Sequence, residues 1–125
     1  MVIRYSGQEL SVDFPDLDQM DFFGELIDGK GTATFHAYRG VLLKDLLIAK
    51  GVEISGLTVT SADNYRVEFT SEEILEEDRV YAAVTVDGKS IEGIDPGTDG
   101  VQIIVFGDPN SKRCVRYAAI IEMVP

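Results

Sequence analysis

The sequence holds 125 residues, of which 45% are hydrophobic and 9% aromatic, and these values exclude a disordered or collagen-like chain. Acidic residues outnumber basic ones by 22 to 11, so the net charge of −11 opposes binding to nucleic acid or anionic membrane. The length fits one domain, over residues 1–125, that is large enough to bury its own core.

Strand-like segments dominate the first third of the chain, and we expect strands over residues 2–5, 9–12, 22–27 and 32–36. Ser6-Gly7-Gln8 separates the first two strands and predicts a hairpin. Asp28-Gly29-Lys30-Gly31 separates the last two, and its Asp28-Gly29 pair is expected to supply the positive φ of a hairpin turn. Residues 14–20, with Pro15, are interpreted as the connection between the two hairpins.

The clearest helix is predicted over residues 41–50, because apolar residues recur there at helical spacing. Gly51 follows this segment and suits a left-handed C-terminal cap. Strands are expected over residues 57–60 and 65–69. A second helix over residues 71–76 is indicated by a capping box, in which the Thr70 hydroxyl accepts from the amide of Glu73.

The last third is predicted to return to strands. Residues 80–86 form a strand that ends at the Asp87-Gly88 turn, and residues 90–100 form a loop rich in turn residues. The nearly continuous apolar run over residues 101–106 predicts a central strand covered on both faces. A polar loop over residues 107–113 leads to a terminal strand over residues 115–123. About eight strands and two short helices predict an α+β fold with mixed curved sheets.

Cys114 is the only cysteine, which excludes an internal disulfide. No run reaches the ~18 apolar residues of a membrane span. The segment from Met1 to Leu10 lacks both the basic region and the apolar run of a signal peptide. If Met1 is the natural first residue, we expect a cytoplasmic protein.

The order of motifs from residue 38 to residue 123 resembles one known family. Tyr38-Arg39-Gly40-Val41-Leu42-Leu43-Lys44-Asp45-Leu46-Leu47 is similar to the aromatic-x-Gly-Val-x-Leu-x-x-Leu-Leu segment of the sulfite-oxidase-type molybdopterin-binding domain. Later motifs match in order, namely Asp63-Asn64-Tyr65, the acidic segment Glu72-Glu73-Ile74-Leu75, the Asp87-Gly88 turn, and Lys112-Arg113-Cys114-Val115-Arg116-Tyr117 before Ile121-Glu122-Met123. The resemblance implies the sulfite oxidase molybdopterin-binding fold.

The chain departs from that family where the metal is bound. Catalytic members carry a molybdenum-ligating cysteine well before the Gly-Val-x-Leu segment, whereas no cysteine precedes Tyr38 here. Cys114 falls where the family usually has a serine. Because soft metals need a thiolate or a comparable ligand, the resemblance implies a compact relative without the reaction centre.

Lys112, Arg113 and Arg116 form the local cluster of positive charge, beside the loop that contains Asp108. In the resembled family this region contacts the pterin and its phosphate, which implies that Arg113 and Arg116 clamp an anionic ligand. Arginine suits this role because its planar fork donates two parallel hydrogen bonds. The alternative is that these cations balance neighbouring acids such as Asp108.

His36, Arg39 and Cys114 are further candidates. The resemblance places His36 near the cofactor region, where it would line a pocket with Tyr38 and Arg39; the alternative is a partly exposed strand histidine. One histidine cannot form a metal site alone, so no metal ligands are assigned. Neighbouring cations would lower the pKa of the Cys114 thiol and favour a ligand or nucleophile. Its place at the start of an apolar strand favours a small buried residue instead.

The favoured hypothesis is a non-catalytic ligand-binding or protein-interaction module that takes an anionic small molecule or a pterin, with no cofactor and no catalytic residue expected. Arg113, Arg116, His36 and Arg39 are the predicted binding residues. The alternative is a molybdopterin-dependent oxidoreductase, or a subunit of one, that binds the pterin cofactor. A third hypothesis is an accessory protein whose exposed sheet edge docks a larger oxidoreductase.

Overall fold

The computed structural model describes residues 1–93, 97 and 99–124. Within these residues the strands are β1 (Val2–Tyr5), β2 (Gln8–Ser11), β3 (Met20–Ile27), β4 (Ala33–Leu42), β5 (Leu57–Ser61), β6 (Arg66–Phe69), β7 (Val80–Val86), β8 (Lys89–Ser90), β9 (Gln102–Val105) and β10 (Ala118–Met123). The helices are the 3-10 turn η1 (Phe14–Asp16), α1 (Leu43–Ala49) and α2 (Ser71–Leu75). None of the described helices has the length and apolar character needed to cross a bilayer.

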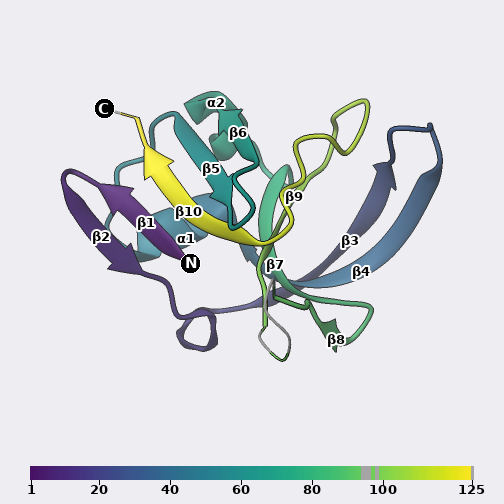
Figure 1. Cartoon of the computed structure of the whole chain (residues 1–125), viewed down its shortest axis with the longest axis horizontal. Helices are drawn as coiled ribbons and strands as arrows, with labels where there is room; N and C mark the ends of the chain where they lie inside the picture. Colours follow the sequence, from purple (N-terminus) through teal and green to yellow (C-terminus); the bar gives the residue numbers. More distant parts are fainter. Residues whose placement is uncertain (94–96, 98, 125) are drawn as a thin grey trace.

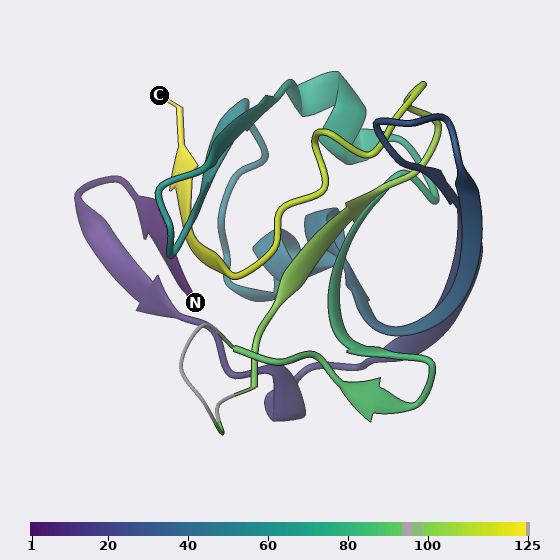
Figure 2. The ribbon, with the colours of Figure 1, turned by 45° about the vertical axis from the view of Figure 1, so that its right-hand side comes forward.

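The strands form two sheets (Figure 1). One has the order β2-β1-β10-β5-β6, with β1 parallel to β10 and the other neighbours antiparallel. The other has the order β3-β4-β7-β8, and β9 also pairs with β7. The long β3–β4 hairpin extends away from β1 and β2 and is strongly curved (Figure 2). The α+β fold with mixed curved sheets is therefore confirmed.

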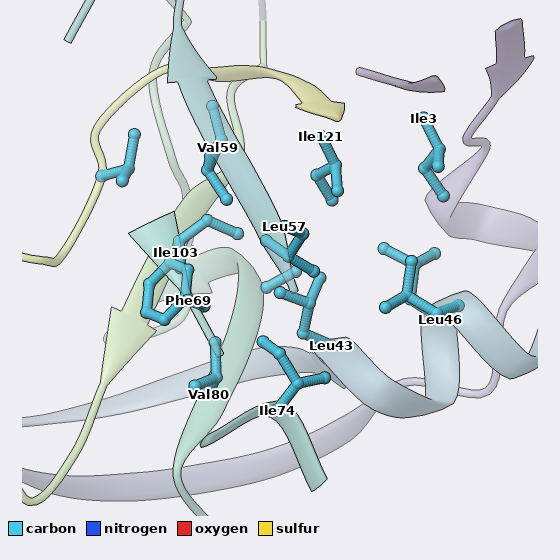
Figure 3. Close-up of a cluster of buried hydrophobic side chains, with 14 of the residues drawn as sticks. Ile3, Leu43, Leu46, Leu57, Val59, Phe69, Ile74, Val80, Ile103 and Ile121 are labelled. Carbon is cyan, nitrogen blue, oxygen red and sulfur yellow. The ribbon is translucent and has the colours of Figure 1, made fainter. Parts of the chain in front are cut away.

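A large hydrophobic cluster joins the first sheet to the helices, β7 and β9. Figure 3 shows side chains of β5 and β10, such as Val59 and Ile121, above Leu43 and Leu46 of α1. A smaller cluster on the other sheet includes Phe22, Tyr38, Tyr81 and Ile104. In β9, Ile103 belongs to the large cluster and Ile104 to the small one, so both faces are covered as predicted.

Helix α1 is shorter than the predicted helix over residues 41–50. Val41 and Leu42 end β4, where they pair with Ala82 and Tyr81 of β7. The apolar run over residues 41–50 is compatible with a buried strand and with a helix. Pairing with β7 makes its first two residues part of β4. The predicted cap at Gly51 is confirmed: its φ is 71°, its N–H donates to the carbonyl of Ile48 at 3.0 Å, and Val52 N–H donates to Leu47 at 2.9 Å.

The turns confirm some predictions and correct others. The capping box between Thr70 and Glu73 is present at α2. In the β3–β4 hairpin the left-handed residue is Gly31, with φ of 82°, and not the predicted Asp28-Gly29 pair. The Asp28 carboxylate instead accepts from the N–H groups of Lys30 and Thr32, which organises a longer turn. Both strands of this hairpin also run beyond their predicted limits of 22–27 and 32–36.

The terminal strand begins at Ala118 and not at the predicted residue 115. Val115 makes an isolated bridge with Ile103, and Tyr117 has a φ of 55°, which interrupts the extended backbone. The register then shifts between Ala118 and Ile120, so simple alternation from residue 115 does not describe the buried face. The predicted loop over residues 90–100 includes residues 94–96 and 98, which lie outside the described part.

Candidate functional site

The strongest candidate site is a surface cavity of about 700 Å³ beside the concave side of the β3–β4 hairpin. Its lining comes from the hairpin, the β7–β8 turn, the start of β9 and residues 111–117. The lining residues are Leu26, Asp28, Thr34, His36, Tyr38, Val86, Asp87, Lys89, Ser90, Ile91, Glu92, Gln102, Ser111, Cys114, Arg116 and Tyr117. This volume lies within the range of small-molecule sites, roughly 300–1,000 Å³.

The β7–β8 turn fixes one wall of the cavity. Asp87 and Gly88 have φ of 50° and 80°, which is the left-handed pair that a tight hairpin turn requires. The Asp87 carboxylate then reaches β4, where it accepts from the Ala37 N–H at 3.0 Å and contacts His36 Nδ1 at 2.7 Å. These contacts, led by the Ala37 N–H, hold the pKa of Asp87 below its ordinary value.

His36 is oriented by this contact. Thr34, His36 and Tyr38 lie on the same face of β4 because side chains alternate along a strand, and this face lines the cavity. The rings of His36 and Tyr38 meet edge to face, with centroids 6.0 Å apart. With Nδ1 engaged by Asp87, Nε2 makes no hydrogen bond to the described residues and is available to a ligand.

Arg116 and Lys89 are the cations of the cavity wall. Both residues are exposed, and neither forms an ion pair with any residue in the described ranges. They come from different segments: Lys89 begins β8 and Arg116 directly follows the Val115 bridge. The acids of the wall are Asp28, which serves its own turn, Asp87, and Glu92. The cavity therefore presents both donors and acceptors, with two cations open to a ligand.

Burial raises the pKa values of two titratable groups in the inner wall of the cavity, Tyr38 and Cys114. Desolvation, followed by the charges of Cys114 and Asp87, raises the pKa of Tyr38 to about 12, so its hydroxyl stays protonated. Burial also raises the pKa of the Cys114 thiol, although its Sγ accepts from the Val105 N–H at 3.4 Å. The prediction that neighbouring cations lower the pKa of the Cys114 thiol is therefore wrong. Cys114 is partly buried and lies outside any strand.

Arg113 lies in an ion-paired network away from this cavity. Its guanidinium makes two bonds to Asp108, at 2.8 and 2.9 Å, and a third to Glu73. It also lies over the ring of Phe69, 5.1 Å from the centroid. Arg79 joins the same carboxylates, contacting Asp108 at 3.0 Å. Arg113 thus follows the alternative interpretation, in which cations balance neighbouring acids.

Arg39 lies on the opposite face of β4 from His36. The two positions differ by three residues, and an odd spacing along a strand places side chains on opposite faces. Arg39 contacts Asp21 of β3 at 3.1 Å and is not part of the cavity lining. The structure therefore brings together His36 and Arg116, and leaves Arg39 and Arg113 elsewhere.

Sequence reasoning missed several lining residues. Lys89 directly follows the predicted Asp87-Gly88 turn, and this position was the available signal for a cation at the cavity. Gln102 and Tyr117 gave no comparable signal, because their positions depend on the β9 pairing and on the left-handed backbone at Tyr117. Among the described residues, no group of three or more His, Cys, Asp or Glu side chains is arranged to hold a metal ion.

Comparison with known proteins identifies a shared fold but does not assign this chain to a family. Neither a family model nor a curated protein matches this chain. Among solved structures, the sulfane dehydrogenase SoxCD from Paracoccus pantotrophus matches with a TM-score of 0.77. The two chains are 16% identical, and the match covers 98% of this chain but only 37% of that one. This similarity shows a shared fold with part of an oxidoreductase, and the relationship to the sulfite-oxidase-type family stays a prediction.

Proposed function

We propose that this chain is a non-catalytic binding module that holds a small anionic ligand in the cavity lined by His36, Lys89 and Arg116. The observation that carries the proposal is the contrast between the arginines. Arg113 is committed to two carboxylates, whereas Arg116 faces the cavity without an ion pair in the described part of the chain. A free guanidinium beside a concave surface is suited to a phosphate or carboxylate.

The mixed charge of the lining narrows the ligand class. Arg116 and Lys89 would bind the anionic group, while the carboxylate of Glu92 would accept hydrogen bonds from a donor edge. A phosphorylated pterin has both features, since its amino and ring N–H groups are donors at the far end from the phosphate. The residues therefore fit the organic part of the cofactor that the sequence resemblance implies.

The residues do not fit a molybdenum ion held by a thiolate of this chain. Cys114 is the only thiol of the sequence, and burial raises its pKa, so the protonated form is favoured at neutral pH.

A subunit of a molybdopterin-dependent oxidoreductase is the second candidate. It is supported by the fold shared with a sulfane dehydrogenase and by the coverage of 37% of that chain, which leaves room for further elements in a partner. Metal and pterin analysis of protein expressed with molybdate separates the two. Stoichiometric molybdenum would favour the subunit, and pterin without metal would favour the binding module.

The proposal is tested by thermal shift with inorganic phosphate, a nucleoside monophosphate and a pterin carrying a phosphate. A ligand at 100 times its Kd stabilises the folded state by about 2.7 kcal/mol, which raises the Tm by about 10 °C in a domain of this size. Arg116→Gln should weaken the binding of the phosphorylated probe by about 10- to 100-fold, because it removes a charged hydrogen-bond donor.

Arg66→Gln is the matched control, since Arg66 is exposed on β6 and does not line this cavity. It should bind the probes like the parent protein. Equal binding by the Arg116→Gln variant, or no response to any of the three probes, would refute the proposal.

A further inference from the structure

The outer edge of β3 is a free sheet edge whose hydrogen-bonding pattern can be read from its ends. β3 is the terminal strand of its sheet and pairs only with β4 among the described strands. Ile27 carbonyl accepts from the Ser111 N–H at 2.7 Å, away from β4. Asp28 N–H, one residue later, donates inward to the Thr32 carbonyl at 2.9 Å. Odd-numbered residues of β3 therefore direct both backbone groups outward.

Three consecutive outward positions remain open. The loop that holds Ser111 covers the edge at Ile27, beyond these positions. Within the described residues, the backbone of Asp21, Phe23 and Glu25 receives no hydrogen bond from another segment. An edge with this many open donors and acceptors is a template for an added strand.

The side chains of the same residues form an apolar centre with acidic flanks. Phe23 and Phe35 of β4 are 68% and 65% exposed, with ring centroids 5.9 Å apart. Asp21 and Glu25 lie on either side of Phe23 on this face of the sheet, because they are spaced by two residues. The Asp21 side chain remains 79% exposed despite its contact with Arg39. The face is opposite to the one that lines the cavity.

The acidic charges of Asp21 and Glu25 disfavour a second copy of this chain as the partner of the β3 edge. An antiparallel second copy centred on Phe23 would oppose Asp21 of each chain to Glu25 of the other. Centring the pair on Asp21 or Glu25 would oppose that residue to itself. Centring it on Phe22 or Gly24 would set a carboxylate opposite Phe23 in both chains and leave the two phenylalanine rings unmatched. Like charges directly opposite each other on neighbouring strands are destabilising, and the net charge of −11 adds to the repulsion.

We propose that the β3 edge binds an extended segment of a basic partner protein as an added strand. The segment has the pattern basic-x-aromatic-x-basic, which places its aromatic residue beside Phe23 and Phe35. Its basic residues then lie opposite Asp21 and Glu25. The backbone of the segment bonds to the open groups of these β3 residues. This surface is independent of the cavity and of the ligand proposed for it.

The test uses two labelled peptides and fluorescence anisotropy at low ionic strength. The probe is Thr-Lys-Thr-Phe-Thr-Lys-Thr, and the control is Thr-Glu-Thr-Phe-Thr-Glu-Thr. The lysine peptide would form two opposite-charge pairs with Asp21 and Glu25, whereas the glutamate peptide would form two like-charge pairs. The lysine peptide should therefore bind at least about tenfold more tightly. Equal affinities, or no binding of the lysine peptide, would overturn the proposal. Light scattering of the protein alone would also overturn it by showing a dimer that Phe23→Lys abolishes.

A backbone variant separates strand addition from simple charge attraction. Glu25→Pro removes an outward N–H but leaves the inward bonds of the even-numbered residues to β4. Glu25→Ala removes the same carboxylate and keeps the N–H. Binding should be lost in the proline variant and weakened in the alanine variant, and equal binding by both would contradict strand addition. If the proline variant does not fold, hydrogen exchange replaces it: the peptide must slow exchange at Phe23 and Glu25 in the parent protein.

Discussion

Replacing Glu73 by glutamine tests whether the network around Arg113 is structural. Glu73 is partly buried, and hydrogen bonding by Arg113 is the largest cause that lowers its pKa from 4.5 to about 2. The free-energy equivalent of this difference is about 3 kcal/mol, at roughly 1.36 kcal/mol per pH unit. Glutamine keeps the shape and the capping hydrogen bonds at Thr70. We therefore expect Glu73→Gln to lose about 2–3 kcal/mol of unfolding free energy at neutral pH.

The pH dependence of this loss has a defined sign. Folding lowers the pKa of the Glu73 carboxylate. Its contribution to the free energy of unfolding is therefore fully present above pH 4.5 and is lost as the pH falls towards 2. The difference in stability between the parent and Glu73→Gln should shrink across this interval. Glutamine does not titrate, which makes the variant a suitable reference.

Urea unfolding followed by circular dichroism at several pH values measures both effects. Glu72→Gln is the matched control, because Glu72 also lies in the first turn of α2. Within the described residues its carboxylate accepts a hydrogen bond only from Ser71. It should change the stability by less than about 0.5 kcal/mol. A loss in Glu73→Gln no larger than in this control would refute the structural role of the network. A loss that stays constant from pH 4.5 down to 2 would do the same.

Three further outcomes are expected. Gly40→Ala should prevent stable folding, seen as loss of the cooperative unfolding transition, because an added Cβ would lie 2.0 Å from the Ala82 carbonyl oxygen. Gly24→Ala should destabilise by about 1–3 kcal/mol in urea unfolding, since its Cβ would lie 2.5 Å from the Phe106 ring, a side chain that can shift at a cost. The Cys114 thiol should react with a disulfide reagent more slowly in the folded protein than in urea, because burial raises its pKa, and the rate should increase with pH as the thiolate forms.

The fold was largely predictable because local signals agree with the tertiary structure. The Thr70 capping box and the Gly51 cap depend on nearby residues, and both were predicted correctly. The start of α1 was not, because Val41 and Leu42 satisfy a helix pattern and a buried strand equally well. Only the pairing of β4 with β7, remote in sequence, decides between them.

The site was predictable only in part. His36 and Arg116 line the same cavity, although they lie 80 residues apart in the sequence. Arg39 lies on the other strand face, which follows from its spacing once β4 is known to continue to Leu42. The partner of Arg113 in α2 lies 40 residues away, and no local pattern indicates it. Electrostatic networks of this kind depend on packing, not on sequence order.

The most direct measurement is an amide chemical-shift titration of the isotope-labelled protein with a phosphorylated pterin. Saturable shifts should concentrate at His36, Lys89, Gln102 and Arg116, with Phe23 and Arg66 unaffected. Saturable shifts centred on Arg113, or none at the cavity residues, would contradict ligand binding in this cavity.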